Sequence, residues 1–169
     1  MKVVFVEIER CIACLSCERV CLFHQAEIHQ GHAANIFVHV DMDHRRIFTA
    51  TCRQCEVAMC MKVCPSGALS RDPRTHAVVV DKNRCIGCGL CVTACPFGSV
   101  QLDGIQRVAA KCDLCGGDPR CVQVCMAKAL HFGSINELAE LKRKRTDLKL
   151  CIRAMHWQKD ADHEGEDGN

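Results

Sequence analysis

The chain has 169 residues, a formal net charge of +2 and only 4% aromatic residues, so it has the mass of one domain with a small conventional core. As thiolate ligands of iron, sixteen of its seventeen cysteines would make the charge negative, which excludes the strong basic excess typical of nucleic-acid binding. No apolar run approaches the ~18 residues that a membrane-spanning helix requires, so no direct membrane insertion is expected.

The compartment is inferred from the N-terminus and from the use of cysteine. The stretch 1–10 is too short and too charged to hold the apolar segment of a signal peptide before Cys11. In the cytoplasm thiols stay reduced, and dense cysteines bind metal more often than they form disulfides. We therefore expect a cytoplasmic protein with metal-ligating cysteines.

In chain order, the first predicted element is a strand over residues 3–8, which leads into a first group of four cysteines spaced C-x2-C-x2-C-x3-C. A hairpin is predicted over 36–51, with its turn at 41–44. It leads into a second group, spaced C-x2-C-x4-C-x3-C and followed by Pro65. The two groups are Cys11, Cys14, Cys17 and Cys21, and Cys52, Cys55, Cys60 and Cys64.

A turn at residues 72–74 and a strand over 77–80 lead into the third group, again C-x2-C-x2-C-x3-C and followed by Pro96. Strands are predicted after it and on both sides of the fourth group, over 99–102, 105–109 and 129–132. The fourth group is spaced C-x2-C-x5-C-x3-C. These two groups are Cys85, Cys88, Cys91 and Cys95, and Cys112, Cys115, Cys121 and Cys125.

The third group reproduces the bacterial ferredoxin run C-x2-C-x2-C-x3-C-P. In that run three cysteines in a tight loop bind three corners of a [4Fe–4S] cubane, and the fourth, on the following short helix, completes a different cluster. Four groups that all end in x3 therefore predict four [4Fe–4S] clusters on sixteen cysteines. Structural zinc favours separated C-x2-C pairs, often with histidine, whereas these cysteines recur as a triplet plus one, so zinc is disfavoured. The C-x-x-C-H motif of c-type haem does not occur in this sequence.

The gaps between groups indicate which groups share clusters. Only 21 positions separate Cys64 from Cys85, whereas 31 separate Cys21 from Cys52, so we pair the second group with the third and the first with the fourth. Pairing the first with the second and the third with the fourth remains an alternative. The four expected ligand sets are Cys11, Cys14, Cys17 with Cys125; Cys112, Cys115, Cys121 with Cys21; Cys52, Cys55, Cys60 with Cys95; and Cys85, Cys88, Cys91 with Cys64.

These elements predict an α+β fold of two ferredoxin-like pairs, bis-[4Fe–4S] units with approximate twofold symmetry, over residues 1–133. The inner pair is expected over 52–98, and the outer pair combines 1–30 with 105–133.

A different character begins at Ser134, which forms a capping-box signature with Glu137. A helix and an apolar extension that docks a partner subunit are expected over 134–158, with packing of the extension on the protein's own sheet as the alternative. The acid-rich residues 159–169 are expected to form a disordered tail.

Several neighbours of the cysteines bear on the clusters. Gly87 is expected to let the backbone approach inorganic sulfur closely. Leu22 and Met126 stand where the ferredoxin run has proline, so local changes of the turn are expected there. Cationic neighbours could raise a nearby reduction potential; they are Arg53, Lys62, Arg84 and Lys111.

The stretches CIGCGLCVTACPFG (85–98) and KCDLCGGDPRCVQVC (111–125) resemble the four-cluster subunits of larger oxidoreductases, over roughly residues 1–133. That group serves carbon monoxide dehydrogenase, hydrogenase, formate dehydrogenase, and molybdenum or tungsten enzymes. The overall pattern is most similar to the small polyferredoxin subunit of a tungsten-dependent aldehyde oxidoreductase, followed by the carbon monoxide dehydrogenase carrier.

The resemblance implies a non-catalytic electron-transfer subunit in a hetero-oligomer. It would relay electrons between a catalytic subunit, a tungsten or molybdenum enzyme being favoured, and another redox partner such as a flavin subunit. A freely diffusing polyferredoxin is the alternative. No catalytic residue is expected.

Overall fold

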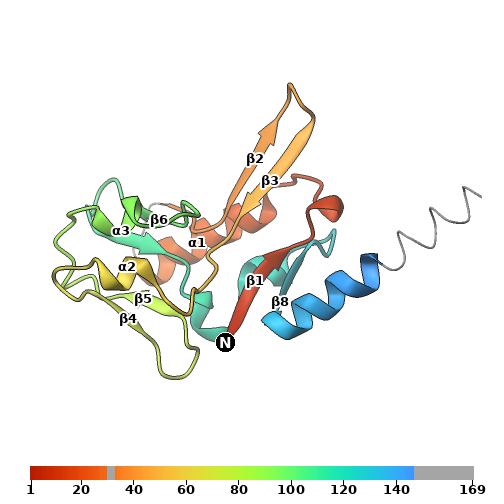
Figure 1. The fold of residues 1–169 in the computed structure, drawn as a ribbon. Helices are drawn as coiled ribbons and strands as arrows, with labels where there is room; N and C mark the ends of the chain where they lie inside the picture. Colours follow the sequence, from red (N-terminus) through yellow and green to blue (C-terminus); the bar gives the residue numbers. More distant parts are fainter. Residues whose placement is uncertain (30–32, 147–169) are drawn as a thin grey trace, which may run out of the picture. The chain divides into compact units, whose positions relative to one another are not determined.

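The computed structural model describes residues 1–29 and 33–146 (Figure 1). It divides the chain into one unit over Met1–Gly133 and a second unit that starts at Ser134. The second half of the predicted docking extension, the predicted tail and Cys151 lie outside the described residues. Within the ranges 1–29 and 33–146, no helix combines the length and the apolar character needed to cross a membrane.

The first unit is built from short strands and helices. In chain order they are β1 (Lys2–Val6), η1 (Ile8–Arg10), α1 (Ser16–His29), β2 (Phe37–Asp41), β3 (Arg46–Ala50), α2 (Met59–Lys62), β4 (Leu69–Arg71), β5 (Val78–Val80), α3 (Leu90–Thr93), β6 (Val100–Leu102), β7 (Ala109–Lys111), η2 (Leu114–Gly117), α4 (Arg120–Gln123) and β8 (Leu130–Ser134).

The strands form two-stranded sheets. In one of them β1 pairs with β8, although almost the whole sequence of this unit separates the two strands. The strand before the first cysteine group therefore lies beside the strand after the fourth. The other sheets are antiparallel hairpins, β2 with β3, β4 with β5, and β6 with β7. The predicted hairpin over 36–51 is confirmed, with Val38 opposite Thr49, and it projects from the rest of its unit (Figure 1).

One strand prediction was wrong. Instead of a strand over 105–109, the chain forms a turn, and β7 begins only at Ala109. The carboxylate of Asp103 accepts hydrogen bonds from the amides of Ile105 and Gln106, at 2.9 and 2.8 Å, and these bonds hold the turn closed.

The helix of the first group differs from the others. The helices α2, α3 and α4 each have four residues, as expected for a ferredoxin run, whereas α1 has fourteen. It continues through Cys21 because Leu22 keeps the backbone N–H that proline lacks. His24 follows on the same helix and is buried.

Two small apolar cores surround the cysteines. One contains Ile36 together with Val4 and Leu130 from the two ends of this unit, and Cys17, Cys21, Cys112 and Cys125 pack against it. The other contains Ala58, Val78 and Val100, and Cys60, Cys64, Cys85 and Cys95 pack against it. Each core thus excludes water from the cysteines of two groups.

The second unit begins with the helix over 135–146. Its start has the predicted capping box: the amide of Ser134 donates to the Glu137 carboxylate at 2.5 Å, and the amide of Glu137 donates to Ser134 Oγ at 3.2 Å.

Candidate cluster-binding sites

Three cavities in the first unit each bring a loop triplet of cysteines together with one cysteine from a distant group. The three sets are Cys11, Cys14, Cys17 and Cys125; Cys112, Cys115, Cys121 and Cys21; and Cys52, Cys55, Cys60 and Cys95. Each cavity also carries apolar lining, such as Val6, Val4 or Val78. For three of the four expected sets, the four cysteines of the set therefore surround one cavity.

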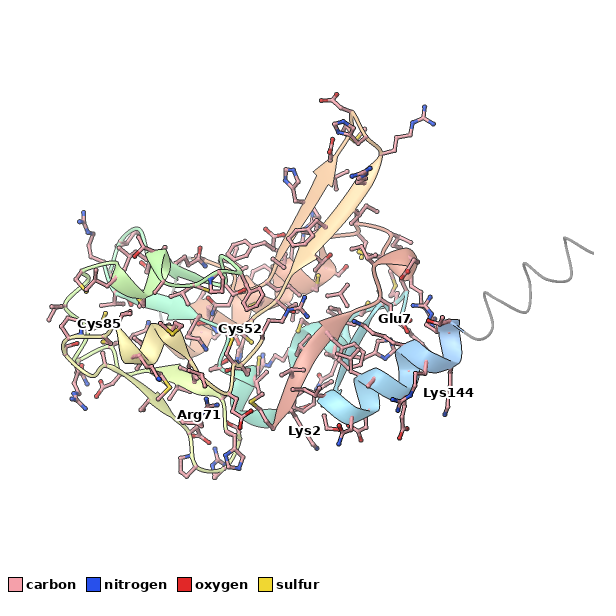
Figure 2. The ribbon with its side chains drawn as sticks, in the orientation of Figure 1. Lys2, Glu7, Cys52, Arg71, Cys85 and Lys144 are labelled. Carbon is pink, nitrogen blue, oxygen red and sulfur yellow. The ribbon has the colours of Figure 1, made fainter. Side chains whose placement is uncertain are left out.

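Three of the remaining four cysteines share one environment. Cys91 is buried in the second core, and Cys64 and Cys85 pack against that core. Cys88 is exposed. Figure 2 shows Cys85 near the left edge of the unit and Cys52 closer to its middle.

The four loops share an unusual backbone conformation at the second residue after their first cysteine. Ala13, Gln54, Gly87 and Leu114 have φ values of 54°, 47°, 68° and 61°. Three of them are not glycine, and such a left-handed conformation costs on the order of 1–3 kcal/mol and persists only where the surroundings enforce it. Left-handed residues of this kind turn successive N–H groups into a concavity that binds anions, including iron–sulfur clusters. The loops therefore fit the predicted cofactor.

The last cysteine of each group accepts a backbone N–H bond at sulfur. In three groups the donor is the amide four residues later: Ala68 for Cys64, Ser99 for Cys95 and Ala129 for Cys125, at 3.3, 3.4 and 3.2 Å. The long helix α1 removes that local donor, and the amide of Asn35 donates to Cys21 Sγ at 3.2 Å instead. Hydrogen bonds to sulfur tune the potential of a cluster.

Burial raises the pKa of two thiols strongly when no metal is bound. It raises the pKa of Cys17 to about 11, aided by the neighbouring thiols of Cys11 and Cys125. It raises the pKa of Cys121 to about 12, aided by Cys115 and Cys21. Cysteines of distant groups thus interact electrostatically. Because a metal binds the thiolate, occupation of these sites must release protons.

Two side chains that the sequence did not single out hold the loop of the second group. Arg71 donates from Nη2 to the carbonyl oxygens of Cys55 and Glu56, at 2.7 and 3.0 Å. Gln54 is 1% exposed and donates from Nε2 to the Cys112 carbonyl oxygen at 2.8 Å. No spacing pattern marks either residue, because Arg71 lies outside the motif and the partner of Gln54 lies in another group.

The structure adds a second constraint on Gly87 to the expected approach to sulfur, which stays a prediction. A Cβ at this position would overlap the backbone carbonyl oxygen of Arg107, so the neighbouring turn is the close contact that the structure shows. The four cationic candidates differ in exposure: Arg53, Lys62 and Arg84 are exposed, whereas Lys111 is buried.

The donor sets fit a polynuclear centre. Among residues 1–29 and 33–146, no three His, Cys, Asp or Glu side chains converge closely enough to hold one metal ion. The thiols instead stand around cavities with apolar walls, which suits the larger body of a cubane.

Comparison with known proteins identifies the family. A family model described as a 4Fe-4S dicluster domain matches residues 44–135, and one described as a 4Fe-4S binding domain matches 8–23. The chain is 37% identical over 153 residues to the thiosulfate reductase electron transfer subunit of Salmonella typhi, covering 80% of this chain and 76% of that protein.

Two further relatives agree. The B subunit of the anaerobic dimethyl sulfoxide reductase of Escherichia coli is 34% identical over 162 residues, covering 85% of this chain and 77% of that protein. The polyferredoxin-like subunit of the aliphatic sulfonate oxidoreductase of Pyrococcus furiosus is 37% identical over 122 residues, covering 69% and 67%.

The motifs, the loops and the relatives together show a protein with four [4Fe–4S] clusters. Its role is electron transfer within a larger oxidoreductase complex, without a catalytic site of its own. The chain belongs to the [4Fe–4S] dicluster family of iron–sulfur electron-transfer subunits.

Proposed function

We propose that the clusters are held by nested groups, the first with the fourth and the second with the third, in the four ligand sets expected from the spacing. The shared cavities and the pairing of β1 with β8 support this assignment. In the same proposal residues 1–133 form one four-cluster domain with an inner pair over 52–98, and the two pairs have ferredoxin-like symmetry.

In the same proposal, the four clusters stand in a linear order. The thiols of Cys112 and Cys52 are close enough that Cys52 adds to the rise in the pKa of Cys112, which burial dominates. Cys14 and Cys88 are exposed. We therefore place the sets of Cys112 and Cys52 in the middle and those of Cys14 and Cys88 at the two ends, where partners exchange electrons. The clusters supply one-electron exchange, and the chain holds them in order and keeps them dry.

Paired substitutions test the ligand sets in the full chain. Cys125→Ala and Cys14→Ala should each impair one cluster, and the double variant should lose no more iron than one cluster's worth because both act on the same set. Cys125→Ala with Cys88→Ala should lose two clusters' worth. Iron analysis of anaerobically purified protein measures the difference. If instead the iron losses of Cys125→Ala and Cys88→Ala are non-additive, the third group shares clusters with the fourth, as in the alternative pairing.

We infer that the partner is the catalytic subunit of an oxidoreductase of the molybdenum or tungsten type that acts on a small sulfur compound. The names of three relatives carry the sulfur-compound part of this inference, because their enzymes act on thiosulfate, dimethyl sulfoxide and aliphatic sulfonates. The molybdenum or tungsten type comes from the resemblance stated from the sequence. The tungsten-dependent aldehyde oxidoreductase expected from the overall pattern stays a second proposal, as do a flavin subunit and a cytoplasmic location.

Anaerobic affinity purification from native extract tests the partner. The dithionite-reduced complex should be reoxidised, as followed by the visible absorption of the clusters, when thiosulfate, dimethyl sulfoxide or a sulfonate is added. An oxidised complex that is reduced by an aldehyde would establish the aldehyde oxidoreductase instead. Recovery of the protein without any bound subunit would favour a freely diffusing carrier.

A further inference from the structure

Lys111 is a buried cation at the junction between two ligand sets. It is the last residue of β7 and directly precedes Cys112, and it is only 5% exposed. The other cationic neighbours of the cysteines are on the surface, where water and salt screen their charges. Burial of a lysine ammonium is costly unless its donors are hydrogen-bonded, so its placement needs an explanation.

The ammonium is held by neutral oxygens. It donates to the carbonyl oxygen of Val78 at 2.5 Å and to that of Cys112 at 3.0 Å, and it lies 3.5 Å from Gln54 Oε1. None of these acceptors is a carboxylate, so the hydrogen bonds stabilise the positive charge without cancelling it.

Gln54 is itself fixed in place. Its Oε1 accepts a hydrogen bond from the Val78 amide at 2.9 Å, and its Nε2 donates to the Cys112 carbonyl oxygen at 2.8 Å. Three segments of the chain, from the second group, β5 and the fourth group, thus meet around Lys111. This network keeps the side chain in one position, as a tuning charge requires.

The charge acts on the adjacent sulfur ligands. Lys111 lines the cavity that Cys52, Cys55, Cys60 and Cys95 surround. Lys111 does not line the cavity around Cys112, Cys115, Cys121 and Cys21, nor the one around Cys11, Cys14, Cys17 and Cys125. Of these three cavities, the charge of Lys111 therefore lies closest to the one surrounded by the set of Cys52.

We propose that Lys111 is a positioning residue whose buried charge raises the reduction potential of the cluster held by Cys52, Cys55, Cys60 and Cys95. The proposal rests on the ligand sets of the proposed function. Reduction adds one negative charge to a cluster, and a nearby cation in a poorly screened interior favours the reduced state. The cluster at the middle of the chain would then accept electrons more readily than it would without Lys111.

Redox titration of the holo-protein, followed by electron paramagnetic resonance, tests this. Cys60→Ser and Cys95→Ser each replace one ligand sulfur by oxygen and identify the signal of this cluster. Lys111→Met removes the charge at similar length, Lys111→Gln is a second neutral variant, and Lys111→Arg keeps the charge. Lys62→Met is the matched control, because Lys62 is exposed and follows Cys60 by two residues.

We expect Lys111→Met and Lys111→Gln to lower the equilibrium constant for reduction of the identified cluster at least tenfold, about 59 mV for a one-electron couple. Lys111→Arg and Lys62→Met should shift it much less, and iron content should stay unchanged. An unmoved potential in neutral variants that retain all their iron overturns the proposal. So does iron loss from both neutral variants, because the charge would then serve assembly.

The marker variants keep this outcome separate from that of the proposed function. If Cys60→Ser and Cys95→Ser alter different signals, the ligand set is wrong. If they alter the same signal and Lys111→Met does not move it, the ligand set stands and the role of Lys111 fails.

Discussion

Gly67, Gly98 and Lys128 follow the last cysteine of their groups by three residues and share a left-handed conformation, with φ values of 60°, 60° and 49°. The amide of each donates to the carbonyl oxygen of that cysteine, and the next amide points at its sulfur. Lys128 adopts this conformation although lysine rarely does. The hydrogen bond to sulfur therefore determines the turn more strongly than the choice of residue does.

At Gly87 the requirement for glycine is sharper, which gives a prediction. Gly87→Ala would place a Cβ against the Arg107 carbonyl oxygen and would add about 1–2 kcal/mol of backbone strain at φ 68°. We expect the variant to lose the iron of one cluster, that of Cys85, Cys88 and Cys91, faster than wild type under a chelator. Absorbance loss at a fixed chelator concentration measures the rate.

Gly104→Ala is the control for Gly87→Ala, because a Cβ at Gly104 has no heavy atom within 4 Å. It should leave the rate of iron loss unchanged. Equal rates for the two variants would show that the contact with Arg107 is not limiting.

The sequence predicts the ligands better than it predicts their surroundings. Cysteine spacing is local, so all sixteen candidate ligands could be named from it. The burial of Lys111 and Gln54 depends on segments far apart in the chain, since 57 positions separate the two side chains in sequence. Sequence reasoning grouped Lys111 with three surface cations because nothing near it distinguishes a buried lysine from an exposed one.

Among the elements, the helix α1 shows how one missing proline changes the local fold. It runs from Ser16 to His29, past Cys21, and displaces the turn that elsewhere supplies an N–H to the last sulfur. Asn35 restores that bond from beyond the helix. The departure at Leu22 was visible in the sequence, but its consequence was not, because the replacement donor lies 14 residues beyond Cys21.

Proline substitutions at the two departures should have opposite outcomes. Leu22→Pro would remove a backbone donor inside α1 and clash with the preceding turn, at a cost of about 3 kcal/mol or more. Met126→Pro should be tolerated, because α4 already ends at Gln123 and the equivalent positions hold Pro65 and Pro96. The thermal unfolding midpoint of each anaerobic holo-protein gives the comparison. A similar fall in both midpoints would contradict the role assigned to the long helix.

Strands were predictable where β-branched and apolar residues gather between turn signals. The hairpin β2–β3 follows its predicted range closely, and Val38 and Thr49 face the cavity of the first group. The predicted strand over 105–109 was displaced because the Asp103 carboxylate captures two amides of that segment. A single side chain that bonds to the backbone can thus override a weak strand pattern.

For the molecule as a whole, the cysteines occupy the place of a larger core. The buried residues of each core are few and mostly small, and thiols complete the packing around them. Which groups pair is a long-range property, so the spacing only favoured the nested arrangement. The sheet of β1 with β8 adds the evidence that local patterns lacked, because it brings residues about 130 positions apart side by side.

This reliance on metal gives a prediction for iron removal. An iron chelator under reducing conditions should unfold residues 1–133, because without clusters the chain loses its ligand bonds and must bury thiols around vacant space. Far-ultraviolet circular dichroism should lose most of its signal as about sixteen iron atoms are released. The iron-free chain should show no cooperative thermal transition, and limited proteolysis should cleave it throughout this range. A cooperative transition in iron-free protein would instead show that the two apolar cores suffice to hold the fold.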